Sequence, residues 1–246
     1  MRNNLKKGEN LCYSQINYIS SPKVYNVIFN KMKKIHVPKI VPASNDANEL
    51  EKVFATIKEE VIDCCNWPED FPYTPAVNVK VFHNGENLYI KFSVTENDIQ
   101  ANVTEDKGAT WTDPCVEFFV SPHGNMDYYN FECTCTGKLL LAWHPAGEPK
   151  ESAPMNVIDS VKRFPSLGTQ CFALREGEHS WNVIEIIPAA ALFRSSIEKW
   201  DGKKMTANFY KCGDLLPTPH FISWAPIEWK EPSFHRPEFF GEMIFE

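Results

Sequence analysis

Apolar and polar residues alternate along most of the chain after residue 75, a spacing typical of β-strands. The alternation runs through residues 77–81 and again through 88–94, and the Asn84-Gly85 dipeptide between them favours a tight hairpin turn. Residues 111–120 and 128–135 alternate in the same way. Further strands are predicted at 137–143, 156–163, 169–175, 181–187, 204–212, 219–225 and 240–245. This pattern predicts an all-β chain, an antiparallel β-sandwich of jelly-roll type.

Two segments depart from the strand pattern and have helical spacing instead. Residues 44–57 place four apolar side chains on one face, and Asp46 stands where it can cap the helix, with Glu49 three residues later. A brief helical turn fits residues 188–193. We therefore expect the sandwich to carry one or two short helices.

The first 35 residues differ in composition from the rest, being rich in Asn, Ser and Lys with scattered Tyr and Ile. They are predicted to form an N-terminal extension or arm, and residues 36–246 a single domain. A strand-like pattern begins at Met32. Either Met32 is the biological start and the preceding residues are an upstream extension, or they form an ordinary arm packed on the domain.

Two glutamates fall in the middle of predicted strands. Alternation places Glu117 on a face with Cys115 and Phe119, and Glu132 on a face with Asn130. A carboxylate costs several kcal/mol to bury without partners, so each must reach water, a hydrogen-bond donor or a ligand. A salt bridge to a neighbouring strand is an equally good explanation for Glu117 taken alone.

A tryptophan stands close to the first of these glutamates. Trp111 lies at the end of a polar loop over residues 102–113, shortly before Glu117. An indole ring stacks on the C–H face of a pyranose, and a carboxylate accepts the protons of sugar hydroxyls. This combination favours a sugar site. The alternative is that Trp111 closes the edge of the sandwich.

Trp111, four intervening residues and then Val116-Glu117 entering a strand make a pattern that resembles the family 9 carbohydrate-binding modules and their DOMON-like relatives. The resemblance reappears in Ile222-Ser-Trp224 and in residues 234–241, and it covers roughly residues 36–246. In the family, another aromatic residue precedes the closing Phe-Gly. Phe234 takes that place here, where a Trp is expected.

The resemblance implies a non-catalytic module that binds a mono- or oligosaccharide and is linked to carbohydrate catabolism. It implies that Trp111 and Phe234 bracket the sugar while Glu117 accepts its hydroxyl protons. It also implies that calcium could bind, although no acidic loop has EF-hand spacing. Trp224 suits either core packing or the lining of the site. The residues expected to bind the ligand are Trp111, Glu117, Asn130, Glu132, Trp224, Phe234, His235 and Arg236.

Two other functions remain open. Glu117 and Glu132 would serve as the carboxylate pair of a glycoside hydrolase if they lay roughly 5–5.5 Å or 6.5–9.5 Å apart. A β-sandwich that has lost sugar binding would instead serve protein interaction. The modules of the family are accessory domains attached to glycosidases, whereas here the module makes up nearly the whole chain.

Composition limits the classes of partner that the chain is expected to bind. A net charge of −7 without a basic stripe argues against nucleic acid, and the lack of an 18-residue apolar run argues against a membrane span. The eight cysteines include no CxxC pair and the seven histidines no HxH or HxxxH pair, so no metal site is predicted. Since the N-terminus lacks the pattern of a signal peptide, we expect free thiols and a cytoplasmic protein.

Overall fold

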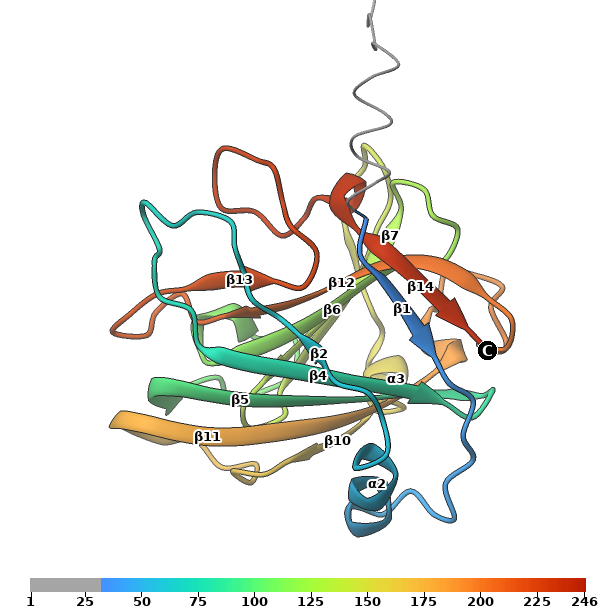
Figure 1. The fold of residues 1–246 in the computed structure, drawn as a ribbon, viewed down its shortest axis with the longest axis horizontal. Helices are drawn as coiled ribbons and strands as arrows, with labels where there is room; N and C mark the ends of the chain where they lie inside the picture. Colours follow the sequence, from blue (N-terminus) through green and yellow to red (C-terminus); the bar gives the residue numbers. More distant parts are fainter. Residues whose placement is uncertain (1–31) are drawn as a thin grey trace, which may run out of the picture. The chain divides into compact units, whose positions relative to one another are not determined.

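Residues 32–246 are described by the structure, a computed structural model, and they form two β-sheets packed face to face with two short helices (Figure 1). The predicted β-sandwich is confirmed. The question of an upstream extension or arm over residues 1–31 lies outside the described residues. None of the helices in 32–246 is long and apolar enough to cross a membrane.

The larger sheet has nine strands within the described part of the chain, and β6 and β7 lie near its centre. Its main path runs in the order β1 (Lys34–Val37), β14 (Gly241–Phe245), β12 (Lys204–Cys212), β6 (Cys115–Ser121), β7 (Tyr128–Thr134), β8 (Leu139–His144) and β9 (Glu151–Ser152). Off this path, β13 (Phe221–Ser223) pairs with the end of β12, and β3 (Cys64–Cys65) pairs with β13. The pairing is antiparallel except between β1 and β14, which are parallel.

The smaller sheet has five antiparallel strands in the order β10 (Lys162–Pro165), β11 (Phe172–Pro188), β5 (Asn87–Ala101), β4 (Ala76–His83) and β2 (Glu60–Val61). The predicted turn at Asn84-Gly85 joins β4 to β5, and Gly85 has a positive φ of 99°. The helices are α2 (Ala47–Phe54) and α3 (Met155–Ile158), and the 3-10 turns are η1 (Thr110–Thr112), η2 (Ala189–Ala191) and η3 (Pro237–Phe239). Asp46 caps α2 as predicted, because its side chain accepts the amide of Glu49.

Strand alternation divides the apolar residues among three layers. The inward residues of both sheets, such as Val116, Phe118 and Phe131, fill the space between them. Helix α2 covers the outer face of the five-stranded sheet. The outer face of the nine-stranded sheet carries a separate cluster that includes Tyr210 and Phe234. The loops over the nine-stranded sheet therefore cover an apolar surface.

One strand prediction, over residues 156–163, is wrong. Helix α3 occupies Met155–Ile158, and β10 begins only at Lys162. The carbonyl of Pro154 accepts the amides of Val157 and Ile158 at 3.0 and 3.2 Å, which closes a helical turn. These local backbone hydrogen bonds outweigh the strand preference of the β-branched residues.

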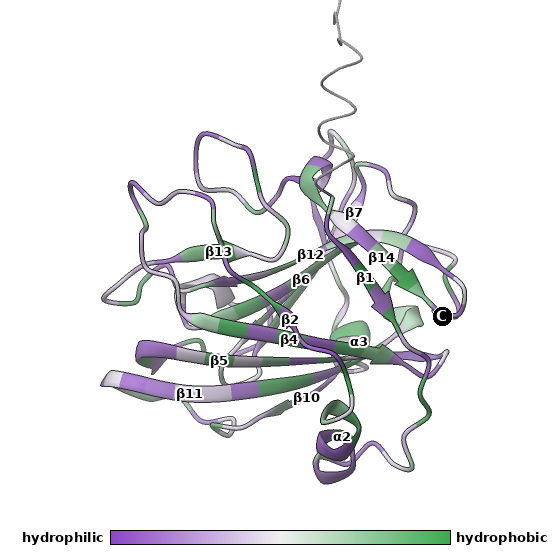
Figure 2. Cartoon of the chain, viewed as in Figure 1, coloured by the Kyte–Doolittle hydropathy of each residue, from purple (hydrophilic) through white to green (hydrophobic). Residues whose placement is uncertain are grey.

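The strands predicted separately at 169–175 and 181–187 are a single strand, β11. The residues between them are exposed, and the register with β5 shifts on either side of Arg175. Figure 2 shows this end of β11 in purple and pale colours, in contrast to its green half beside β10. The apolar alternation is missing there because neither face of this ribbon is buried.

Candidate functional site

A pocket of about 330 Å³ opens on the outer face of the nine-stranded sheet. Glu117 of β6, Glu132 of β7 and Cys212 at the end of β12 line its base, and Trp111 of η1 and the loop before η3 line its sides. We call it the outer-face pocket. It lies on this face because alternation turns Glu117 away from the inward-facing residues of its own strand.

Five of the eight residues predicted to bind the ligand line this pocket: Trp111, Glu117, Glu132, Phe234 and His235. Six other lining residues were missed: Lys150, Cys212, Asp214, Phe221, Pro232 and Ser233. They come from loops or strand ends far apart in the sequence, and only tertiary structure brings them together. The one usable signal was that Cys212 and Asp214 stand at the end of the strand predicted over 204–212.

The other three predicted residues lie elsewhere. Asn130 is fully buried behind Glu132, to which it donates a hydrogen bond. Trp224 is fully buried in the core between the sheets, with its indole N–H directed at Glu60 (3.3 Å). Arg236 stacks on Trp229, with its guanidinium carbon 3.4 Å from the ring centroid. The side chain of Asn130 is hydrogen-bonded to a residue that lines the pocket, and Arg236 contacts one through its backbone, since its N–H donates to the carbonyl of Phe234 at 2.7 Å.

Both carboxylate oxygens of Glu132 accept hydrogen bonds from buried side chains. Thr110 Oγ1 donates to Oε2 at 2.9 Å, and Asn130 Nδ2 donates to Oε1 at 2.6 Å. Asn130 is held in turn, since its Oδ1 accepts the amide of Ala142 at 3.0 Å and lies 3.1 Å from His144 Nε2. Glu132 is therefore fixed in one orientation by residues that do not themselves line the pocket.

Glu117 lies directly opposite Glu132 in the register of β6 and β7 and is held far less firmly. Its side chain is 3% exposed, and within residues 32–246 its hydrogen-bond partner is a single weak donor, Cys212 Sγ, 3.2 Å from Oε1. Directly opposite residues in antiparallel strands have Cβ atoms about 4.5–5.5 Å apart, so the two carboxyl groups lie within reach of each other.

Burial sets the protonation of this pair. It raises the pKa of Glu117 well above its usual range, and the charge of Glu132 adds to the rise. Burial also raises the pKa of Glu132, but the hydrogen bonds from Thr110 and Asn130 act in the opposite direction. Since donors satisfy both oxygens of Glu132 and a single thiol approaches Glu117, burial favours the protonated form more strongly at Glu117 than at Glu132.

The aromatic side chains that line the pocket differ in how much of their surface is exposed. Trp111 is 38% exposed, so its ring is available to a ligand. Phe234 is 8% exposed and stacks on Tyr210, with centroids 4.2 Å apart. His235 Nδ1 lies 2.8 Å from the hydroxyl of Tyr128, and burial lowers the pKa of its ring to about 4. At neutral pH the pocket therefore presents one open aromatic face, a closed aromatic wall and a neutral imidazole.

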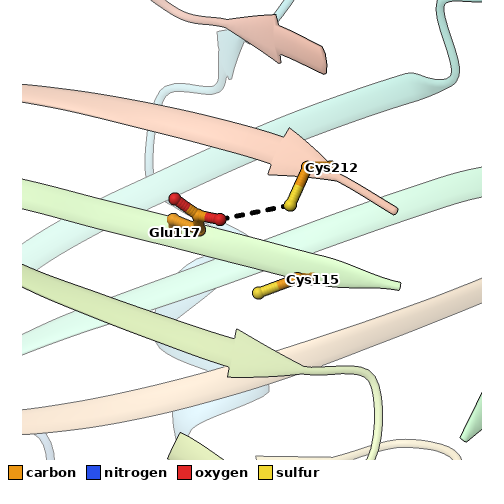
Figure 3. Close-up of side chains that lie close together, drawn as sticks. All are labelled: Cys115, Glu117 and Cys212. Atoms are coloured by element: carbon orange, nitrogen blue, oxygen red, sulfur yellow. Dashed lines mark hydrogen bonds between the residues drawn. The ribbon is translucent and has the colours of Figure 1, made fainter. Parts of the chain in front are cut away.

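Two acidic residues of the polar loop over residues 102–113 have partners within the protein. Asp106 pairs with Arg163 at 2.7 Å, and Asp113 Oδ2 accepts the backbone amides of residues 102 and 103. Within residues 32–246, a single group of potential metal ligands lies close together: Cys115, Glu117 and Cys212 (Figure 3). The seven cysteines of this part of the chain are free thiols.

The sequence matches the model of carbohydrate-binding family 9 over residues 46–245. The chain belongs to this family. A protein from Bacteroides uniformis ATCC 8492, proposed to bind carbohydrate, has a similar structure with 40% identity and a TM-score of 0.84, and the match covers 87% of this chain and 100% of that one. The comparison with curated proteins finds no match.

Two more distant structures share the fold. Both are family 9 modules from Caldicellulosiruptor kristjanssonii, one in complex with glucose and one with cellotriose. The first has 13% identity and a TM-score of 0.51 and covers 87% of this chain and 96% of that one. The second has 12% identity and a TM-score of 0.50 and covers 87% and 94%. At these identities the likeness extends to the fold alone.

Proposed function

We propose that the outer-face pocket binds one end or one unit of a mono- or oligosaccharide without catalysis. The proposal is carried by one observation: two buried carboxyl groups, neither in a salt bridge within the described residues, face a pocket whose rim carries an exposed tryptophan. Buried acids without cations are unfavourable unless a ligand uses them. A sugar offers both an apolar ring face and hydroxyl donors.

Each lining residue has a role that follows from its contacts. Trp111 stacks on the ring, because its face is the one left open. Glu132 accepts hydroxyl protons in the orientation that Thr110 and Asn130 impose. Phe234 forms a wall, because Tyr210 already covers one of its faces. This differs from the symmetrical bracket implied by the family resemblance, with Trp111 as the stacking platform.

The related modules guide the choice of ligand. Those from Caldicellulosiruptor kristjanssonii hold glucose and cellotriose, so glucose and β-1,4-linked glucose oligomers are the first sugars to test. A protein of this kind would contribute to carbohydrate breakdown by holding a sugar, while a separate enzyme supplies the chemistry.

The test is calorimetric titration of the protein with glucose and cellotriose. Trp111→Ala should weaken binding about tenfold or more, since aromatic stacking contributes about 0.5–1.5 kcal/mol beyond the area buried. Glu132→Gln should weaken it by a similar factor, because hydrogen bonds to a charged group contribute about 1.5–3 kcal/mol.

Trp229→Ala is the matched control. Trp229 is also exposed, at 45%, but it does not line the pocket. Its removal should leave sugar affinity unchanged. Binding that survives Trp111→Ala at wild-type strength, or that Trp229→Ala weakens equally, would show that the sugar binds elsewhere.

A second candidate is glycoside hydrolysis, favoured by the direct cross-strand placement of Glu117 and Glu132. Their expected separation is close to the roughly 5–5.5 Å of retaining glycosidases. Turnover of aryl glycosides by the wild-type protein, abolished in Glu117→Gln while sugar binding persists, would replace the binding function with this one.

A further inference from the structure

Three potential metal ligands lie together at the base of the outer-face pocket. Cys115 and Cys212 are directly opposite each other in the register of β6 and β12, and Glu117 follows Cys115 by two residues on the same face of β6. Figure 3 shows the two strands side by side, with Cys212 and Glu117 joined by a hydrogen bond and Cys115 next to them. Two strands of a rigid sheet therefore set the positions of all three groups.

Their spacing suits a tetrahedral ion. The two thiol sulfurs and a carboxylate oxygen all lie within 4.8 Å of one another, and Cys212 Sγ is 3.2 Å from Glu117 Oε1. Zinc bonds of about 2.3 Å to sulfur and 2.0–2.2 Å to oxygen, at tetrahedral angles, place such atoms roughly 3.6–3.8 Å apart. Only small side-chain adjustments separate the present arrangement from a coordination shell.

The surroundings leave one coordination position open. Cys115, Glu117 and Cys212 are 0%, 3% and 1% exposed, but Glu117 and Cys212 line the pocket, so an ion there would face it. Asp214 lines the same pocket, and its Oδ1 is buried without a hydrogen-bond partner in the described part of the chain. Three protein ligands with an open fourth position are characteristic of zinc sites that exchange a water or ligand.

We propose that Cys115, Glu117 and Cys212 bind a thiophilic divalent cation of the zinc class, with its fourth position open to the outer-face pocket. On binding, the two thiols release their protons to solvent and coordinate as thiolates, and Glu117 releases the proton that burial favours and coordinates as a carboxylate. Thiolate donors select zinc over calcium and magnesium, which prefer oxygen ligands. A CxxC pair does not mark this site in the sequence, because its two sulfurs come from strands far apart in the chain.

Cobalt(II) is the probe for this site. The full chain, reduced and stripped of metal, is titrated with Co²⁺ in the absence of saccharide, so the result does not depend on sugar binding. One equivalent should produce the thiolate-to-cobalt charge-transfer band and the intense visible bands of a tetrahedral complex. Zinc should displace the cobalt, and it should also raise the melting temperature of the protein.

Cys115→Ser and Cys212→Ser should each weaken metal binding more than about 100-fold, because the loss of a mere outer-shell partner already costs 10–100-fold. Cys133→Ser is the matched control and should bind cobalt like wild type. Cys133 is equally buried, and its thiol contacts the next carbonyl as that of Cys115 does, but it faces the core between the sheets.

Glu117→Gln gives a third variant that keeps both thiols, in case a serine variant does not fold. It should retain the charge-transfer band but bind at least tenfold more weakly, since an amide oxygen is a poorer ligand than a carboxylate. Absence of the band in folded wild type, or its persistence in both serine variants, would overturn the proposal. So would a thiol titration showing that Cys115 and Cys212 pair as a disulfide in the native protein.

Discussion

Two neighbouring residues of β12 contact buried acidic side chains on opposite faces of the nine-stranded sheet. Lys211 points inward and binds Glu96 of β5 at 2.8 Å, with both side chains 0% exposed. Cys212 points outward, toward Glu117 and the pocket. Inside the sandwich the carboxylate has a cation, a tryptophan N–H donor at 2.7 Å and no access to solvent. Outside, Glu117 and Glu132 form no salt bridge within the described residues and open onto a pocket.

The difference separates structural from functional burial of acids. Glu96 is satisfied by the fold, so nothing further is needed to explain it. Glu117 and Glu132 form no salt bridge within residues 32–246, and a ligand or ion would complete their environment. A third acid, Glu185, is buried like Glu96, but within the described residues it forms no salt bridge, and its Oε1 has no hydrogen-bond partner. Burial raises its pKa to about 7, so its proton replaces the missing cation.

The largest effect should come from breaking the inner pair. Lys211→Met leaves Glu96 charged and sealed, and such a loss costs about 3–5 kcal/mol of unfolding free energy. Urea unfolding at pH 7 measures it. Lys204→Met, on the same strand, removes the exposed ion pair with Glu242 and should cost at most about 1 kcal/mol. If the two variants lose the same unfolding free energy, then burial does not make the Lys211–Glu96 pair more important for stability than the exposed pair.

Glu185→Gln tests whether the raised pKa of Glu185 makes the stability of the protein depend on pH. Because the pKa of Glu185 is about 7 in the fold, against an ordinary value of 4.5, its stabilising contribution is complete below pH 4.5 and is lost as the pH rises through 7. Each pKa unit corresponds to about 1.4 kcal/mol, so wild type should lose about 3 kcal/mol relative to Glu185→Gln between pH 4.5 and 9. Unfolding free energies measured across this range give the difference.

Glu242→Gln supplies a control of opposite sign. Hydrogen bonds from Lys204 and Lys34 lower the pKa of Glu242, so its contribution is lost as the pH falls. Wild type should therefore weaken relative to Glu242→Gln at acid pH. If the Glu185 difference does not change with pH, then Glu185 is charged in the fold and must have found a cation.

The smallest effect concerns the support of the pocket. Thr110→Val removes the hydroxyl that orients Glu132 while keeping the shape of the side chain. Saccharide affinity should fall about three- to tenfold, in line with the loss of one hydrogen bond to a charged group. Thr112→Val is the control in the same turn, since the hydroxyl of Thr112 donates to the carbonyl of Ala109 and not to Glu132. If both variants bind sugar equally well, Glu132 does not depend on Thr110.

Strand alternation was sufficient to predict which face each glutamate occupies. The local period of two placed Glu117 and Glu132 opposite the core-facing residues, and the short link between their strands made them neighbours. These features depend on residues close together in the sequence, so a single chain contains the information.

Long-range pairing was not predictable in the same way. The approach of Cys212 to Glu117 joins residues 95 apart, and it depends on β12 lying beside β6. The placement of Phe234 depends on Tyr210, which stacks on it from another part of the chain. Strand alternation was equally consistent with Trp224 in the core and with Trp224 lining the pocket. Only the position of the second sheet decides between these two places.

The parallel pairing of β1 with β14 has a consequence for synthesis of the chain. Lys34–Val37 lies against Glu242–Phe245, and β14 also stands between β1 and β12. Within residues 32–246, β1 pairs with no other strand, so it cannot join the sheet until β14 has been synthesised. Pairing across such a distance is slow to form, and until then the edge of β12 stays open. The larger sheet is therefore complete only after residues 241–245 have been synthesised.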